Sequence, residues 1–348
     1  MITYQKPAEL YDGLRLHQNE HTGGCSPAVL EALASITAEQ MAFYPPYAAA
    51  TEACASYLGV DPDRLSLVNG LDEGIMALAV GYLRPGAGGV AAPEAIIPEP
   101  AFEIFGFDTE IVGGTCVRLA PNADFSFPLS RVLDAITPRT RVVFITNPNN
   151  PTGVTVSHDA IRTVAARVPA GAVVFVDEAY AEFSGTSLIP SLPSLPNVIV
   201  GRTFSKAFGL AGIRIGAVTG HPEALAPLRL AVPVYSVNIA AVVALQAALA
   251  DQTYLRHYLA EVETSKALLY AACDRLGLGY VRSAANFVLI QAGARAAHLV
   301  RHVAARGIYL RDRSSEPGCA GCVRVSTGIV AHTQRCIDAI QEALCAEE

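Results

Sequence analysis

Side chains that could do chemistry follow two apolar runs of the sequence. Asp177 ends the run AVVFV, and Lys206 lies in a turn rich in Ser and Thr shortly after the run NVIV. A lysine with an ordinary pKa of about 10.4 needs burial or a nearby cation before it can act as a neutral nucleophile at pH 7. An aspartate at the tip of an apolar strand is costly to bury unless a cationic group pairs with it. The pair therefore suggests a nucleophilic amine and a carboxylate that binds a cation.

Three further side chains near Lys206 could bind an anion. Thr203 and Ser205 supply hydroxyl groups, and Arg214 supplies a guanidinium, which are common partners of a phosphate group. Taken singly, each residue has an ordinary interpretation as a helix cap, a turn residue or a surface charge. Taken together, a nucleophilic lysine, a carboxylate for a protonated ring nitrogen and a phosphate cup describe a site for pyridoxal 5'-phosphate.

The elements that must position these residues are strands covered on both faces. Four short runs have Val, Ile and Phe at successive rather than alternate positions, at residues 141–146, 172–176, 197–200 and 213–218. That pattern is typical of the strands of a parallel sheet. A helix is expected at 158–167 with Ser157 as its N-cap, which completes a βαβ unit. The fold class is therefore α/β, in which ligands bind beyond the carboxyl ends of the strands.

The last third of the chain has a different pattern of expected elements, with long helices and few strands. Helices are expected at 238–249, 253–276, 297–306 and 332–346, and strands at 286–291 and 322–326. The change occurs near residues 222–233. We therefore expect an N-terminal segment at 1–40 that packs with the smaller domain and the active site, a large α/β domain at 41–230, and a smaller α+β domain at 231–348.

Composition excludes several classes of protein. Of the 348 residues 51% are hydrophobic and 16% are charged, which excludes a disordered chain. The net charge is −7 without a dense Lys/Arg tract, so we expect no nucleic-acid partner. The most apolar stretch, 232–250, is interrupted by polar residues and predicts a buried helix rather than a membrane span. With no signal-peptide pattern and only eight cysteines, we expect a cytoplasmic protein.

In order and spacing, these motifs resemble the class I/II (fold type I) pyridoxal phosphate-dependent aminotransferases. The signature consists of NPNNPTG at 147–153, DEAY at 177–180 and TFSKAFGLAGIRIG at 203–216, and the resemblance covers nearly the whole chain. It is closest to the histidinol-phosphate aminotransferase branch. The resemblance implies a large domain with a mainly parallel seven-stranded sheet flanked by helices, a smaller α+β domain, and pyridoxal 5'-phosphate as cofactor.

The resemblance also implies roles for the residues that would hold the cofactor. Lys206 forms the covalent link to it and later moves the substrate proton, while Asp177 keeps the pyridine nitrogen protonated. Tyr180 and Asn150 bind the 3-oxygen of the ring, and Phe102 stacks on its face. The phosphate is held by side chains and by two backbone N–H groups at a helix start, namely Thr203, Ser205, Arg214, Leu71 and Asp72.

Other matches concern the substrate and the assembly. Arg324 matches the arginine that clamps a substrate carboxylate, and Arg311 matches the branch's arginine for a substrate phosphate. Asn19 matches an N-terminal substrate-binding motif, although the following residues 21–24 replace the usual aromatic- or proline-containing run. Tyr44 matches a tyrosine that reaches the partner subunit's active site, which implies a homodimer.

The implied reaction is transamination between histidinol phosphate and 2-oxoglutarate, in histidine biosynthesis. One alternative is an aromatic amino acid, such as phenylalanine, as substrate in the same branch. Another is decarboxylation of the threonine-phosphate type, since the fold does not fix the reaction. A non-catalytic regulator domain is disfavoured, because no helix-turn-helix precedes the α/β region.

Three remaining motifs have weaker interpretations. The string at 86–91 fits a dinucleotide-binding pattern but lacks the strand and helix that the pattern needs. Cys319 and Cys322 form a single CxxC, and a structural zinc site needs a second pair. Two histidine pairs have i,i+4 spacing, His17 with His21 and His298 with His302, but a third ligand is missing. We therefore expect no metal.

Overall fold

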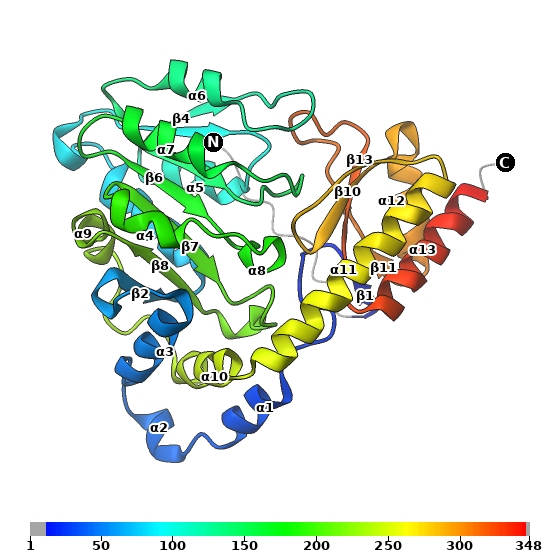
Figure 1. The fold of residues 1–348 in the computed structure, drawn as a ribbon, viewed down its shortest axis with the longest axis horizontal. Helices are drawn as coiled ribbons and strands as arrows, with labels where there is room; N and C mark the ends of the chain where they lie inside the picture. Colours follow the sequence, from blue (N-terminus) through cyan, green and yellow to red (C-terminus); the bar gives the residue numbers. More distant parts are fainter. Residues whose placement is uncertain (1–11, 346–348) are drawn as a thin grey trace.

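A seven-stranded sheet forms the centre of the larger part of the computed structural model, which describes residues 12–345 (Figure 1). The strand order is β2-β8-β7-β6-β5-β3-β4. The strands are β2 (Leu65–Val68), β3 (Glu94–Pro98), β4 (Thr115–Leu119), β5 (Thr140–Thr146), β6 (Val173–Asp177), β7 (Val198–Thr203) and β8 (Gly216–Gly220). From β7 to β4 all neighbours are parallel, whereas β8 is antiparallel to both β7 and β2. The expected mainly parallel sheet is confirmed.

Helices cover both faces of this sheet, which explains why the strands are apolar at successive positions. On β6, Val173 and Phe175 face one hydrophobic core while Val174 and Val176 face the other. The first core includes α4 (Leu71–Tyr82), α5 (Glu103–Ile111) and α9 (Pro222–Arg229). The second includes α3 (Ala48–Leu58), α6 (Leu129–Ala135), α7 (His158–Arg167) and α10 (Ile239–Ala250).

The bounds predicted for α7 are confirmed, whereas those predicted for β8 are not. Helix α7 has the expected bounds, and the Ser157 side chain accepts a hydrogen bond from the backbone N–H of Ala160 at 3.2 Å. The strand expected at 213–218 begins later, at Gly216. Residues Ala211–Ile213 form a 3-10 turn, and Arg214 adopts a left-handed backbone with φ of 59°. This turn interrupts the apolar run before the strand begins.

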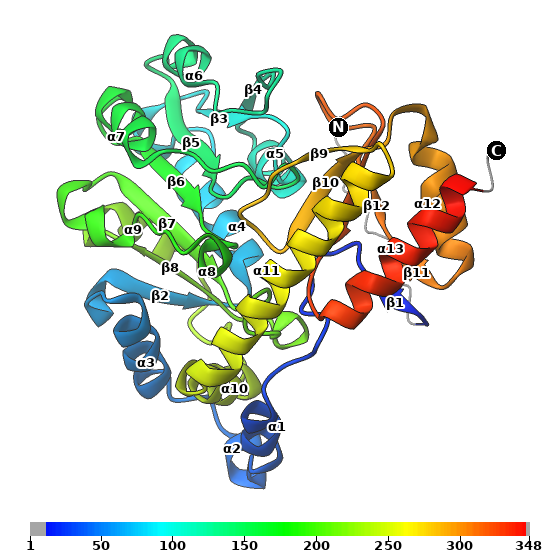
Figure 2. The same cartoon turned by 45° about the vertical axis from the view of Figure 1, so that its right-hand side comes forward.

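The smaller domain is a four-stranded antiparallel sheet with helices packed on it (Figure 2). The strand order is β12-β13-β10-β9, for β9 (Gly279–Val281), β10 (Phe287–Gln291), β12 (Arg311–Asp312) and β13 (Cys322–Ser326). Its core also includes α11 (Gln252–Arg275), α12 (Ala296–Ala305) and α13 (Val330–Cys345). Beside it, β1 (Leu14–Arg15) pairs in parallel with β11 (Ile308–Tyr309). The expected α+β character is confirmed; residue 346 of the last expected helix lies outside the described residues.

The packing of α10 corrects the expected boundary after residue 230. Val242, Leu245 and Leu249 of α10 belong to the core of the larger sheet, and α10 contacts α1 (Pro27–Ala34) and α3. The two domains meet along α11, as Figure 2 shows. Leu255 near its start lies in the larger core, and Leu269 lies in the smaller one.

The N-terminal segment is shared between the two parts. Strand β1 joins the smaller domain, whereas Val29 of α1 joins the larger core. A short helix, α2 (Ala38–Ala42), follows, and residues 1–11 of the expected segment lie outside the described residues. Among residues 12–345, no helix has the length and apolar character needed to cross a membrane.

Replacing Phe175 by Ala should destabilise the larger domain strongly. The ring is fully buried and makes edge contacts with Phe105 and Phe144, so truncation leaves a cavity. We expect a loss of about 3–5 kcal/mol in the free energy of unfolding, measured by urea denaturation. The control is Ile111→Ala, since this side chain is mostly exposed. Equal midpoints for the two variants would contradict the packing described.

Candidate active site

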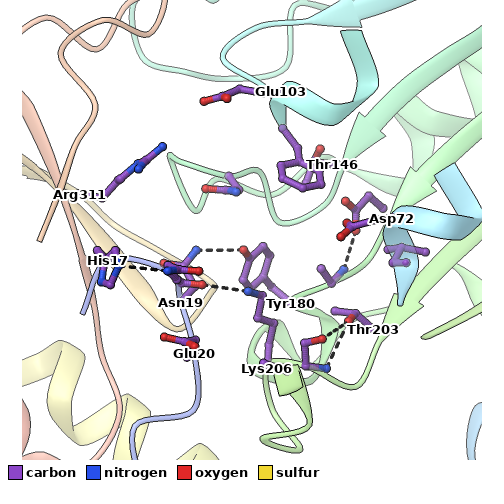
Figure 3. Close-up of a pocket in the computed structure, with 18 of the residues that line it drawn as sticks. His17, Asn19, Glu20, Asp72, Glu103, Thr146, Tyr180, Thr203, Lys206 and Arg311 are labelled. Atoms are coloured by element: carbon purple, nitrogen blue, oxygen red, sulfur yellow. Dashed lines mark hydrogen bonds between the residues drawn. The ribbon is translucent and has the colours of Figure 1, made fainter. Parts of the chain in front are cut away.

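A cavity of about 410 Å³ lies where the carboxyl ends of β5, β6 and β7 face the smaller domain (Figure 3). In Figure 3, Asp72 and Thr203 lie at one end of it, His17 and Arg311 lie at the other, and Tyr180 and Lys206 lie between them. Every predicted site residue except Tyr44 lines the cavity, namely Asn19, Leu71, Asp72, Phe102, Asn150, Asp177, Tyr180, Thr203, Ser205, Lys206, Arg214, Arg311 and Arg324. Its volume is within the range of sites for small ligands.

Parallel pairing places Asp177 at the floor of the cavity. In the strand register Thr146 is opposite Asp177, which in turn is opposite Gly201. The Asp177 carboxylate is buried and accepts a hydrogen bond from the backbone N–H of Ala179 at 3.0 Å. Burial is the main cause that raises the pKa of Asp177 to about 7, and the nearby Asp72 carboxylate acts in the same direction. A cationic ligand atom would keep this carboxylate ionised.

Lys206 offers an amine whose pKa lies near physiological pH. Its Nζ donates a hydrogen bond to the carbonyl oxygen of Gln18 at 3.0 Å. Burial, with the Arg324 guanidinium as the second cause, lowers the pKa of Lys206 to about 8. Such an amine can act as a nucleophile or as a base.

Tyr180 and Asn19 connect the two domains across the site. Asn19 donates from Nδ2 to the Tyr180 hydroxyl at 3.0 Å, and its backbone N–H donates to Ser326 Oγ at 3.0 Å. The Tyr180 ring meets the Phe287 ring edge-on at 5.1 Å, and burial raises the pKa of the Tyr180 hydroxyl. This hydroxyl is therefore a fixed hydrogen-bonding group at the centre of the cavity.

An anion-binding cup lies at the start of α4. Its N-cap, Gly70, has φ of 75°, and a Cβ at this position would clash with the guanidinium of Arg214. Arg214 Nη2 lies 2.9 Å from Asp72 Oδ2, and Thr203 Oγ1 donates to Ser205 Oγ at 3.0 Å. The first backbone N–H groups of a helix have no partner within the helix. Two hydroxyls, a guanidinium and a helix N-terminus therefore surround one end of the cavity.

Arginines from the smaller sheet form the opposite end. Arg311 and Arg324 are direct partners in the antiparallel pairing of β12 with β13. Arg324 donates from Nη1 to Asn150 Oδ1, and from Nη2 to the carbonyl oxygen of His17 at 2.7 Å. Burial, together with the positive charges of Arg313 and Arg311, lowers the pKa of Arg324 to about 9. This end of the cavity is suited to a substrate anion.

Tyr44 lies outside the cavity of its own chain. Its side chain is 73% exposed and stacks on Tyr235, with ring centroids 4.0 Å apart. Other apolar side chains are exposed in the same two segments, namely Met41, Phe43, Leu230 and Val234. A role for Tyr44 in catalysis would require a second subunit.

The divergent segment at 21–24 packs against α11. The His21 ring stacks on Tyr258 at 3.3 Å between centroids, and the Thr22 hydroxyl accepts a hydrogen bond from the backbone N–H of Ile329. Burial lowers the pKa of His21 to about 4. Neither side chain lines the cavity.

Several lining residues were not among the predicted ones: His17, Glu103, Thr146 and Arg313. Thr146 could have been found, because it ends the strand next to Asp177. Glu103 and Arg313 lie more than two hundred residues apart, and their pairing has no local signal in the sequence. Within residues 12–345, no three His, Cys, Asp or Glu side chains are grouped as a metal site.

Known proteins share both the sequence and the fold of this chain. The family model for aminotransferase class I and II matches residues 11–344. A histidinol-phosphate aminotransferase of Symbiobacterium thermophilum is 37% identical, covering 98% of this chain and 93% of the relative. One from Moorella thermoacetica is 32% identical, covering 98% and 88%.

Solved structures agree with this match. The crystal structure of histidinol-phosphate aminotransferase from Sinorhizobium meliloti in complex with pyridoxal-5'-phosphate has a TM-score of 0.87 and 26% identity, covering 97% of this chain and 92% of that one. The Thermus thermophilus aspartate aminotransferase with maleate has a TM-score of 0.79 at 21% identity, covering 95% and 92%, and shares the fold.

The fold and the cavity define an enzyme of the fold type I class of pyridoxal phosphate-dependent transferases. The chain belongs to the aminotransferase class I and II family.

Reductive methylation should reveal the lowered pKa of Lys206. In cofactor-free protein, we expect its rate of reaction with formaldehyde and cyanoborohydride to rise through about pH 8 and then level off, since the neutral amine reacts. Mass spectrometry would resolve Lys206 from Lys6 and Lys266, the other lysines of the chain. A rate that still rises above about pH 10, as for a free lysine, would contradict this description.

Proposed function

We propose that this protein is an aminotransferase that converts histidinol phosphate and 2-oxoglutarate to imidazole acetol phosphate and glutamate. The observation behind the proposal is that one cavity joins Lys206 and Asp177 to a wall of arginines at the opposite end. The relatives named histidinol-phosphate aminotransferase, which match almost the full length of the chain, support the choice of substrate.

The residues present fit pyridoxal 5'-phosphate. Asp177 would pair with the ring nitrogen, because its buried carboxylate needs a cationic partner. Tyr180 and Asn150 would bind the 3-oxygen, and Phe102 would lie against the ring face. The cup would hold the phosphate through Thr203, Ser205, Arg214 and the backbone N–H groups of Leu71 and Asp72. When bound, the cofactor supplies an electron sink for the carbanion that forms at the substrate Cα.

Lys206 would hold the cofactor covalently and then move the substrate proton. Its pKa of about 8 leaves a useful fraction of neutral amine at pH 7, which is required of a base. Asn19 orients the Tyr180 hydroxyl from the substrate side, so both groups are fixed before the reaction begins. Such fixed dipoles need little reorganisation when charge moves in the transition state.

The arginines at one end of the cavity, Arg311 and Arg324, would select substrates by binding their anionic groups. In histidinol phosphate a phosphate ester takes the place of the α-carboxylate, and Arg311 and Arg324, which line one end of the cavity, would bind it. Arg324 would bind the α-carboxylate of glutamate or 2-oxoglutarate in the other half-reaction, through two parallel hydrogen bonds.

We also propose a homodimer in which Tyr44 reaches the partner's cofactor phosphate. Its support is the group of exposed apolar and aromatic side chains in the segments of Tyr44 and Tyr235, since such groups are typical of protein interfaces. A cytoplasmic location agrees with the cysteines, since all eight are free thiols and most are buried.

Replacing Arg311 by Ala should weaken binding of histidinol phosphate more than that of phenylalanine. The loss of a charge-assisted contact to phosphate should raise KM by about 10–100-fold. Single-turnover spectroscopy with histidinol phosphate, phenylalanine and tryptophan would measure this, with the exposed Arg301→Ala as control. Equal half-reaction rates for all three amines in the unmodified enzyme would contradict the proposed substrate. Release of carbon dioxide from phenylalanine or tryptophan would indicate a decarboxylase.

Mixed dimers should test the role of Tyr44. The Lys206→Ala homodimer should lose activity because it lacks the base. The Tyr44→Ala homodimer should lose activity because neither site receives the partner's tyrosine. A dimer with one chain of each variant has one site with both Lys206 and the partner's intact tyrosine, so co-expression should restore activity. Failure of the mixed dimer to exceed both homodimers would show that Tyr44 does not act across subunits.

A further inference from the structure

Arg313 is a third guanidinium at the end of the cavity that Arg311 and Arg324 form, and the proposed function gives it no role. We propose that Arg313 determines specificity by forming, with Arg311, a binding site for a dianionic phosphate group on the substrate, and that Glu316 and Glu103 hold it in place beforehand. This inference rests on the proposed function, which it extends from Arg311 and Arg324 to a third arginine of the same cavity.

The backbone places Arg313 on the same wall as Arg311. The N–H of Arg313 donates to the carbonyl oxygen of Cys322 at 2.9 Å, which extends the pairing of β12 with β13 by one step. Alternate residues of a strand face the same side. Arg311 and Arg313 accordingly both line the cavity, next to Arg324 on the neighbouring strand.

Two carboxylates hold the Arg313 side chain, which is 5% exposed. Nη1 of Arg313 lies 3.3 Å from Glu316 Oε1 and 3.8 Å from Glu103 Oε1. Glu316 is fixed relative to Arg313, because its own N–H donates to the Arg313 carbonyl oxygen at 2.9 Å. Glu103 begins α5 in the larger domain, so the guanidinium is restrained from both domains. Little side-chain entropy is then lost when a ligand binds.

The wall retains hydrogen-bond donors that have no acceptor. Among the described residues, Nε of Arg313 and Nε of Arg324 are buried without a partner. Unmade hydrogen bonds of buried groups are costly, and those of charged groups cost more. Arg313 and Arg324 both line this end of the cavity, so an acceptor-rich ligand bound there would lie against these two side chains.

The charges of the wall favour an anionic ligand. Glu103 and Glu316 both pair with Arg313, whereas Arg311 and Arg324 have no carboxylate partner among the described residues, so the three arginines and two carboxylates leave one net positive charge. A phosphate ester brings up to two negative charges and three acceptor oxygens, whereas a carboxylate brings one charge and two oxygens. Arg313 is therefore positioned to distinguish a phosphate ester from the corresponding alcohol or carboxylate.

The test compares Arg313→Gln and Arg313→Lys with the control Arg335→Gln, an exposed arginine of the same domain. Half-reactions of the holoenzyme would be followed with histidinol phosphate, with histidinol and with glutamate. For Arg313→Gln we expect KM for histidinol phosphate to rise about tenfold or more, with a smaller change in kcat and no change for histidinol. Inorganic phosphate should also inhibit the glutamate half-reaction less than in the unmodified enzyme. For Arg313→Lys, KM for histidinol phosphate should lie between the values for the unmodified enzyme and for Arg313→Gln, because lysine restores the positive charge but not the planar guanidinium.

The outcomes separate this inference from the proposed function. If the unmodified enzyme uses histidinol as well as histidinol phosphate, the proposed function itself fails. If it prefers the phosphate ester and Arg313→Gln keeps that preference, the inference about Arg313 is overturned. A change that is equal for all three substrates would show a structural role and would also overturn it.

Discussion

The carboxylate of Asp177, buried at the end of a strand in an apolar core, is the constraint on which the rest of the site depends. Such a group is costly to keep ionised without a cation beside it. The sheet supplies no such cation from β5 or β7, whose neighbouring residues are Thr146 and Gly201. We therefore propose that the partner comes from the cavity, as a protonated ring nitrogen of the cofactor.

The two domains divide the chemistry between them. The larger sheet supplies the groups that would hold a cofactor, at the carboxyl ends of parallel strands and at the start of α4. The smaller sheet supplies the arginines, and its antiparallel register places Arg311 opposite Arg324. Two contacts join the domains beside the cavity: Asn19 with Tyr180, and Arg313 with Glu103. These contacts would fix the position of a bound substrate relative to the cofactor site.

The sequence was sufficient to predict features that have local causes. Strands buried on both faces are apolar at successive positions, and Ser157 marks the start of α7, so β5, β6, β7 and α7 could be predicted from the residues, whereas the complete seven-stranded sheet was implied only by the family resemblance. The domain to which α10 belongs could not be predicted, because a helix of Ala, Val and Leu presents no polar face to show which core it joins. The ion pair of Arg313 with Glu103 depends on tertiary structure in the same way, since both residues look like ordinary surface charges until the fold brings them together.

A buried ion cluster behind the cavity explains how the strand ends keep their positions. Glu178, next to Asp177, lies 3.4 Å from Arg202, next to Thr203, and Arg202 also pairs with Glu182. Glu178 further accepts hydrogen bonds from the Leu188 N–H and the Ser187 hydroxyl, both at 2.6 Å. Removing one partner from such a cluster costs about 3–5 kcal/mol, because it leaves a buried charge unpaired. Successive residues of a strand face opposite sides, so the charges that fix the ends of β6 and β7 lie behind the residues that face the ligand. The ends of both strands are thus held from behind, and the side chains in the cavity remain free to bind.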